Sequence, residues 1–125
     1  MHILIADDDI GTQTELAGRL ERWGCQVTVV GDGPSVIRSI GDCPGIDLAI
    51  LNWMLPGIDG LRIAKALKDA ESCAQTLVMV GERFRDQVGA TFPLWADGYI
   101  DKPLNFSELR ELIPQLCATD GGLLT

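Results

Sequence analysis

The stretch Asp47-Leu-Ala-Ile-Leu-Asn-Trp-Met-Leu-Pro-Gly-Ile-Asp-Gly60 decides how this chain is expected to fold. Its apolar run, Leu48 to Leu51, is typical of a strand that is buried on both faces of a sheet. Pro56-Gly57 then supplies residues that a type II turn prefers, and Asp59 precedes a periodic segment as a helix N-cap would. We therefore expect Asn52 at the carboxyl end of a central parallel strand, where open α/β sheets carry their functional groups.

Apolar runs and segments of helical periodicity alternate along the rest of the chain. Further strands are predicted at 3–6, 27–30, 77–80 and 99–100. Helices are predicted at about 10–23, 33–40 and 61–70, over a weaker segment at 82–88, and after Asn105, where Glu108 completes a capping box. Pro114 is expected to kink or shorten the last helix. This alternation predicts an α/β fold with a doubly wound parallel sheet of five strands in the flavodoxin-like order 2-1-3-4-5.

Composition and charge exclude several classes of protein. With 125 residues the chain is expected to form one domain over 1–119, followed at 120–125 by the start of a linker or tail. The net charge of −8 argues against nucleic-acid binding by this domain, because phosphate contacts need a basic face. No apolar run is long enough to span a membrane, and Met1 leads directly into a predicted strand, so no signal peptide is expected. The four cysteines include no C-x-x-C pair, which favours reduced thiols in a cytoplasmic protein.

Polar side chains follow three of the predicted strands. Asp7 and Asp8 come after the first strand, Asn52 ends the third, and Lys102-Pro103 follows the fifth. Three acids in a row are also typical of a solvated loop, but the predicted strand order brings these groups to one edge of the sheet. Carboxylate and amide oxygens suit a divalent cation such as Mg²⁺. A lysine beside them could neutralise the cluster or hold a phosphoryl oxygen.

Three motifs together resemble the receiver (CheY-like) domain of response regulators: Ile3-Leu-Ile-Ala-Asp-Asp-Asp9, the stretch 47–60, and Gly98-Tyr-Ile-Asp-Lys-Pro103. The resemblance runs from residue 3 to about residue 116. It implies a place in two-component (phosphorelay) signalling. In that family an acid pair binds Mg²⁺, and an aspartate at the end of the third strand takes a phosphoryl group from a histidine kinase. The resemblance thus implies a signalling module and not an enzyme.

The resemblance also implies roles for individual residues. Asp8 would be a direct metal ligand and Asp7 would act mostly through water, while Asn52 and the backbone carbonyl of Met54 would complete the protein ligands. Lys102, followed by Pro103, would be the lysine of the phosphate site. Tyr99 would be the aromatic switch residue, although packing at the edge of the sheet is an equally good interpretation of its side chain.

Two positions of the phosphorylation machinery depart from the family pattern. Asn52 stands where the family has the phosphoacceptor aspartate, and an amide has no anionic oxygen with which to attack phosphorus. Gly81 stands where the family has a hydroxyl residue, and Glu82 adds negative charge beside it. The sequence therefore predicts a degenerate pseudo-receiver without a competent phosphoacceptor. Because ligand charge tunes metal affinity, Mg²⁺ is expected to bind weakly and not to be required.

The predicted role is that of a phosphorylation-independent protein-interaction module. Its partners would be a histidine kinase or another two-component protein, or an output domain, with a homodimer possible through the fourth helix, fifth strand and last helix. An alternative is a normal receiver in which Asn52 was introduced to block phosphorylation. A remote alternative is a haloacid-dehalogenase-like phosphatase, suggested by Asp7-x-Asp9 followed by Gly11-Thr12.

Overall fold

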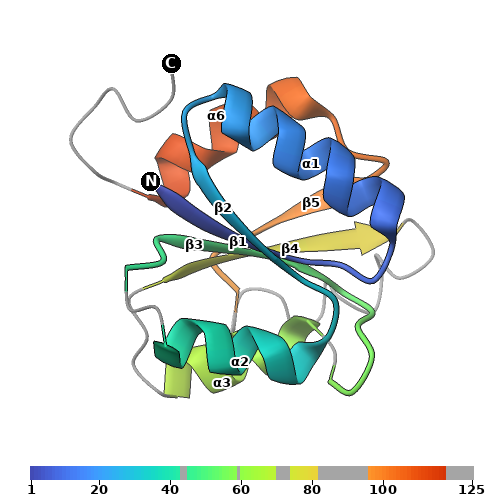
Figure 1. Cartoon of the computed structure of the whole chain (residues 1–125), viewed down its shortest axis with the longest axis vertical. Helices are drawn as coiled ribbons and strands as arrows, with labels where there is room; N and C mark the ends of the chain where they lie inside the picture. The colour runs from blue at the N-terminus through green and yellow to red at the C-terminus, as the bar shows by residue number, and fades with distance from the viewer. Residues whose placement is uncertain (43–44, 59, 70–73, 82–95, 118–125) are drawn as a thin grey trace.

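The computed structural model describes residues 1–42, 45–58, 60–69, 74–81 and 96–117, which form strands and helices in alternation (Figure 1). The strands are β1 His2–Ala6, β2 Gln26–Val30, β3 Leu48–Asn52, β4 Gln75–Gly81 and β5 Gly98–Lys102. The helices among these residues are α1 Ile10–Arg22, α2 Gly33–Asp42, α3 Gly60–Asp69 and α6 Phe106–Leu116. The segment 82–88 and the proposed cap Asp59 lie outside the described residues.

All five strands are parallel and lie in the order β2-β1-β3-β4-β5, which confirms the predicted flavodoxin-like sheet. Helices α1 and α6 cover one face of the sheet, and α2 and α3 cover the other (Figure 1). Because β1 pairs directly with β3, with Ala6 opposite Leu51, the residues that follow these strands reach the same edge. The register of β4 and β5 likewise places Gly81 opposite Lys102.

Burial on both faces of the sheet explains why the sequences of the central strands are continuous apolar runs. Residues 48–51 of β3 are all buried, as predicted for a strand covered on both faces. Successive side chains of a strand point to opposite faces, so the core has two clusters. Ile3, Ile5, Leu48 and Ile50 pack with residues of α1 and α6, while Leu4, Ala6, Ala49 and Leu51 pack with residues of α2 and α3. Burying each large aliphatic side chain contributes about 1.5–3 kcal/mol.

Local signals set the ends of the helices. Asp9 caps α1 and accepts hydrogen bonds from Thr12 N and Oγ1 at 2.8 and 2.7 Å. Asn105 caps α6, accepting from Glu108 N at 3.1 Å, as predicted. Helix α6 continues through Pro114 and ends two residues later, at Leu116.

The strands at the far edge extend beyond their predicted bounds. β4 begins at Gln75 and β5 ends at Lys102, whereas apolar residues alone marked only 77–80 and 99–100. Pairing between neighbouring backbones, and not side-chain pattern, decides how far a ladder extends. The extra pairs carry Lys102 to the edge where β1 and β3 end.

Two of the four cysteines lie in the described residues. Cys25 and Cys117 are buried free thiols, and Cys43 and Cys73 lie outside the described part of the chain. Burial raises the pKa of both thiols, and that of Cys117 reaches about 11. In the ranges described above, no helix has the length and apolar character needed to cross a bilayer.

Candidate functional site at the carboxyl edge of the sheet

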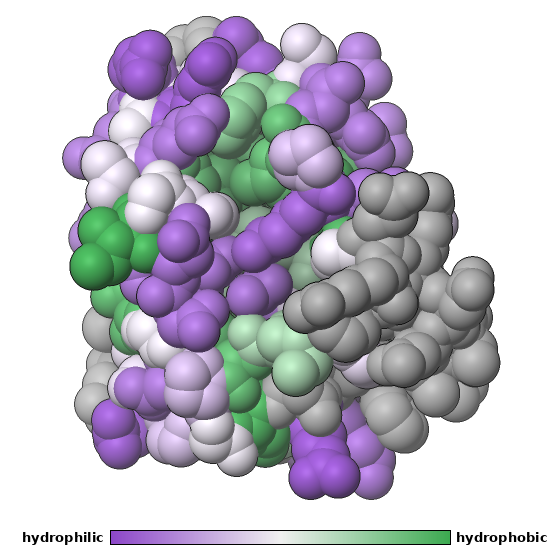
Figure 2. Space-filling view, turned by 90° about the vertical axis from the view of Figure 1, so that its right-hand side faces the viewer, coloured by the Kyte–Doolittle hydropathy of each residue, from purple (hydrophilic) through white to green (hydrophobic). Residues whose placement is uncertain are grey.

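The carboxyl ends of the strands lie together at the right of Figure 1, and Figure 2 faces this edge. A hydrophilic band crosses the middle of that face between hydrophobic patches above and below (Figure 2). Asp7 and Asp8 follow β1, Asn52 ends β3, and Lys102 ends β5. The structure therefore brings to one edge the polar residues that lie up to 95 positions apart in the sequence.

Asp7 is the centre of the site and is fully buried, at 0% exposure. Its Oδ2 accepts a hydrogen bond from Lys102 Nζ at 2.7 Å, and its Oδ1 accepts one from Asp9 N at 2.9 Å. Its backbone carbonyl accepts a hydrogen bond from Gln13 Nε2. A buried carboxylate is tolerated only when paired and hydrogen-bonded, and here both oxygens are engaged. Lys102, whose side chain is 24% exposed, therefore serves as the cation of this site.

The three consecutive acids have three different environments. Asp7 is buried in the ion pair, Asp8 is exposed, and Asp9 caps α1. Hydrogen bonds from the Thr12 hydroxyl and backbone N–H lower the pKa of Asp9. The interpretation of this run as a plain solvated loop is therefore wrong for Asp7, whereas Asp9 is solvated and also caps α1.

Asn52 and the Met54 carbonyl are joined by a hydrogen bond. Asn52 Nδ2 donates to Met54 O at 2.9 Å. The sequence predicts the Asn52 side chain and the Met54 carbonyl as metal ligands. In the structure the amide nitrogen of Asn52, which cannot bind a cation, points at the Met54 carbonyl oxygen. The described residues include no group of three or more His, Cys, Asp or Glu side chains that could hold a metal. As arranged, with Asp7 engaged by Lys102 and only Asp8 exposed, the donor set does not fit a resident Mg²⁺.

The remaining predicted switch positions belong to β4, to β5 and to the residues that follow them in the sequence. Gly81 ends β4 and offers no side chain, and Glu82 lies outside the described residues. Tyr99 is 40% exposed on β5. Pro103 is exposed and follows Lys102 through a cis peptide bond.

The loop after β3 is held by a contact that the sequence did not reveal. Gly33 N at the start of α2 donates to Pro56 O at 3.1 Å. A Cβ on Gly33 would lie 1.8 Å from Ile58 Cγ2 and 2.8 Å from Ile58 O, so only glycine fits there. Gly57, with φ of 89°, makes the turn itself. The Gly33-Pro34 pair was interpreted only as a helix start, because close approach between distant backbones leaves no local signal.

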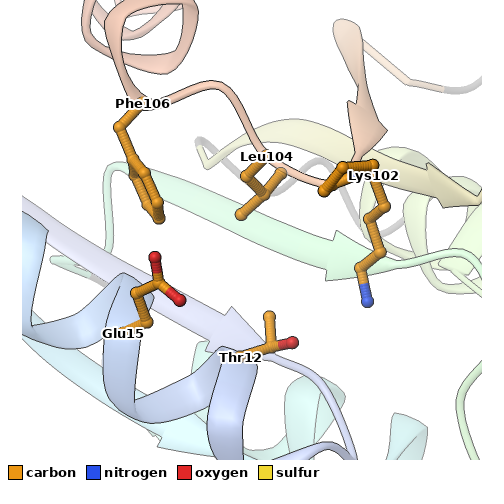
Figure 3. Close-up of a pocket in the computed structure, with 6 residues that line it drawn as sticks. Thr12, Glu15, Lys102, Leu104 and Phe106 are labelled. Carbon is orange, nitrogen blue, oxygen red and sulfur yellow. The ribbon is translucent and has the colours of Figure 1, made fainter.

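A hollow beside the ion pair was also missed. Its volume is about 180 Å³, and it lies between the first turns of α1 and the connection from β5 to α6 (Figure 3). The residues that line it are Thr12, Glu15, Lys102, Pro103, Leu104 and Phe106. Only Lys102 and Pro103 of these carried a sequence motif.

Comparison with known proteins identifies the family to which this chain is similar. The family model described as the response regulator receiver domain matches residues 3–114. Sensory transduction protein RegX3 of Mycolicibacterium smegmatis is 35% identical over 116 residues, which cover 93% of this chain and 49% of that protein. Transcriptional regulatory protein CseB of Streptomyces coelicolor is 36% identical over 97% of this chain and 53% of its own length. The chain spans about half the length of these relatives.

Solved structures agree on the fold. The crystal structure of a response regulator receiver domain protein from Clostridium thermocellum matches with a TM-score of 0.86 over 94% of each chain, at 21% identity. The haloacid-dehalogenase interpretation finds no support in these matches. Its nucleophile would be Asp7, which the fold buries in an ion pair with Lys102.

Proposed function

Because this chain belongs to the response regulator receiver family, we propose that it is a receiver of two-component signalling that acts by protein contact and not by aspartyl phosphate. The observation that carries the proposal is Asn52, which occupies the position at the end of β3 where the sequence resemblance calls for an aspartate. A carboxylate attacks phosphorus through an anionic oxygen, and an amide has none. The Asn52 amide instead donates a hydrogen bond to Met54 O.

The charge balance at the edge supports the same proposal. Three carboxylates at this edge would repel one another in the absence of a cation, and such like charges raise one another's pKa. Here Asn52 removes one negative charge, and Lys102 neutralises Asp7 at 2.7 Å. The buried carboxylate of the edge is thus neutralised by the protein's own lysine, and Asp8 stays exposed to solvent. Because Asp7 is paired with Lys102 and Asn52 with Met54 O, these groups must rearrange before they can hold Mg²⁺ together with Asp8, and we infer that Mg²⁺ binds only weakly and is not required.

The second departure concerns the switch. Gly81 has no hydroxyl that could draw a phosphoryl group or a partner side chain toward β4. Tyr99, 40% exposed, then forms part of a fixed binding surface. The surface predicted for a homodimer combines the fourth helix, β5 and α6, and the residues of that fourth helix lie outside the described ranges.

The partners follow from the family and the charge. We propose a histidine kinase or another two-component protein, or an output domain of the same longer protein, since the chain spans about half of its relatives. The net charge of −8 disfavours nucleic-acid binding by this domain itself. The domain would act in the cytoplasm, as a binding module and not as an enzyme.

Acetyl phosphate with Mg²⁺ tests the proposal on three proteins: the unaltered chain, Asn52→Asp and Asn52→Ala. Intact mass spectrometry is expected to detect no acid-labile phosphoryl adduct on the unaltered chain or on Asn52→Ala. An adduct on the unaltered chain that persists in Asn52→Ala would be at another site, and one lost in Asn52→Ala would refute the proposal.

The Asn52→Asp protein separates the two receiver interpretations. A stable adduct there would favour a normal receiver in which Asn52 blocks phosphorylation, because the rest of the machinery would then be intact. Absence of a stable adduct is the expected result for a degenerate site, since Gly81 still lacks the hydroxyl.

A further inference from the structure

We propose that β2 pairs with β2 of a second copy of this chain across a two-fold axis, so that two five-stranded sheets join into one. Strand β2 forms the edge of the sheet opposite to β5, so this contact is distinct from the homodimer predicted through the fourth helix, β5 and α6. The phosphoacceptor position ends β3 and is not part of the contact. The inference therefore goes beyond the proposed function.

Strand β2 presents open backbone hydrogen-bonding groups. It is the edge strand beside β1, with α1 on one side of the sheet and α2 on the other (Figure 1). Gln26 N donates to Met1 O at 2.9 Å, so the alternation of a parallel ladder turns the N–H and C=O groups of residues 26, 28 and 30 toward β1. Those of Val27 and Val29 point away from β1 and have no hydrogen-bond partner in the part of the chain that the structure describes. These four groups are available to another strand.

The sequence of β2 lacks the features with which edge strands avoid pairing. Such strands usually carry a charged residue or a proline, or a bulge that twists them away from a partner. Residues 26–30 are Gln-Val-Thr-Val-Val, and their ladder with β1 continues without a bulge over all five residues. Val29 is 40% exposed, so an apolar side chain already lies in solvent at this edge. The edge is therefore open to pairing with a second strand.

The charges of the chain also favour this surface for contact between two copies. The helices α1 and α2, which flank β2, together contain three basic and three acidic residues, and β2 contains none. These three elements therefore have no net charge, and the charge of −8 belongs to the rest of the chain. Two copies that meet at other surfaces would repel each other, whereas the surface around β2 does not oppose the approach of a second copy.

The positions of the open groups fit a second copy of β2 itself. In an antiparallel pair, directly opposite residues exchange both of their hydrogen bonds at every second position. A two-fold axis at Thr28, the centre of β2, places Val27 opposite Val29 of the second copy. The same axis places Val29 opposite Val27 of the second copy. All four open groups of each copy then form hydrogen bonds in an isologous contact, in which both copies use the same residues.

The side chains agree with this register. Val27 packs against the core cluster beneath α1 and α6, and Val29, two residues later, lies on the same face of the sheet. Directly opposite residues of an antiparallel pair are close neighbours on one face, so the four valines of the two copies would form one apolar cluster. Thr28 would lie opposite Thr28 of the second copy on the face that α2 covers, which is also a favourable cross-strand pair.

Sedimentation velocity of the unaltered chain, from micromolar to millimolar concentration, tests the pairing. The mass is expected to rise reversibly from 13.5 kDa toward twice that value. The dimer should form only at the upper concentrations, because a pair of short strands buries less than the roughly 1,200 Å² of a stable interface. A chain that stays monomeric at millimolar concentration would overturn the proposal and leave the edge to an extended segment of another protein.

Two lysine variants distinguish the two edges of the sheet. Val29→Lys places a charge in the apolar cluster of the paired strands and is expected to raise the Kd of the dimer about tenfold. Tyr99→Lys places the same charge on β5, at a side chain with the same exposed fraction of 40%. Dissociation of the dimer by Tyr99→Lys and not by Val29→Lys would show that the copies associate through β5, and this result would overturn the proposal.

Hydrogen exchange of single amides, followed by NMR, locates the contact without any substitution. The amides of Val27 and Val29 are expected to exchange several-fold more slowly in concentrated than in dilute protein, because pairing gives them acceptors. The amide of Thr28 already points toward β1 and should change little, so it is the internal control. A dimer that adds no protection at Val27 and Val29 would overturn the proposal. None of these measurements involves Asn52 or phosphorylation, so they can fail separately from the acetyl phosphate experiment.

Discussion

Two carboxylates at opposite ends of the sheet are satisfied in different ways. Asp7, at the carboxyl end of β1, is fully buried and depends on a cation 95 residues away. Asp97, at the amino end of β5, is exposed and forms hydrogen bonds with the neutral residue Thr76 at the start of β4. Its Oδ2 accepts from Thr76 N at 2.8 Å and from Thr76 Oγ1 at 3.1 Å, and Asp97 N donates to Thr76 O at 3.0 Å.

The two carboxylates differ in what the loss of their partners would cost the fold. Hydrogen bonds to a solvated carboxylate join β4 to β5 at little cost, since water can replace them. A buried carboxylate with one lysine partner is costly to the fold if that partner is lost. The Asp7–Lys102 pair belongs to the edge where we propose a degenerate phosphate site, and the Thr76–Asp97 pair joins the starts of β4 and β5.

The largest expected effect is that of Lys102→Met, which removes the cation from buried Asp7. The free energy of unfolding should fall by about 3 kcal/mol, because the carboxylate would be left buried without its ion pair. Urea denaturation followed by circular dichroism measures this. The double variant Asp7→Asn/Lys102→Met should recover most of the loss, and a loss below about 1 kcal/mol in the single variant would contradict our account of the pair.

Gly33→Ala tests how the loop after β3 is held near the site. Its Cβ would lie 1.8 Å from Ile58 Cγ2, so the loop must move, and we expect a loss of about 2 kcal/mol. Gly41→Ala is the matched control in the same helix, because nothing lies within 4 Å of its Cβ. Thermal unfolding should show no loss there. Equal melting temperatures for the two variants would argue against the close packing of this loop.

Thr76→Val tests the Thr76–Asp97 pair at the other end of the sheet. Thr76 is buried, and the change removes the hydroxyl that donates to Asp97. We expect a loss of about 1.5 kcal/mol, smaller than for Lys102→Met, because Asp97 remains solvated. The same urea titration measures both variants. A larger loss of unfolding free energy for Thr76→Val than for Lys102→Met would contradict the difference between the two ends of the sheet.

Asn52→Asp should lower the stability of the metal-free protein by about 1 kcal/mol, because it adds a negative charge beside Asp7 and Asp8. Differential scanning calorimetry in chelator-treated buffer gives the melting temperatures. Mg²⁺ should raise that of Asn52→Asp more than that of the unaltered chain, since added ligand charge strengthens metal binding. An equal or higher melting temperature for metal-free Asn52→Asp would contradict the expected repulsion.

The smallest expected effect is on pH dependence. The hydrogen bonds from Thr12 lower the pKa of Asp9 in the folded state, so its contribution to stability is present above the unfolded pKa near 3.8 and is lost as the pH falls below it. Asp9→Asn keeps a capping residue but cannot titrate. Unfolding free energies measured between about pH 5 and pH 3 should therefore fall slightly less steeply for this variant. Parallel curves would exclude Asp9 as a contributor.

Most of the fold followed from local pattern. The apolar run 48–51, the cap at Asn105 and the alternation of strand and helix predict the sheet and its strand order, because burial and capping leave a local signal in neighbouring residues. The edge where the polar groups meet followed from that order. The lengths of β4 and β5 did not, since they depend on pairing between distant backbones.

The amino-acid sequence alone determined which chemical groups the edge could contain: Asp7, Asp8 and Lys102, with an amide at Asn52 and no hydroxyl at Gly81. Only the tertiary structure decided their pairing. It buried Asp7 against Lys102, bonded Asn52 to Met54 O, and placed Glu15 beside Phe106. The physical reason is that residue type sets the available charges and donors, whereas their energies depend on distance and burial, which arise when segments far apart in the chain pack together.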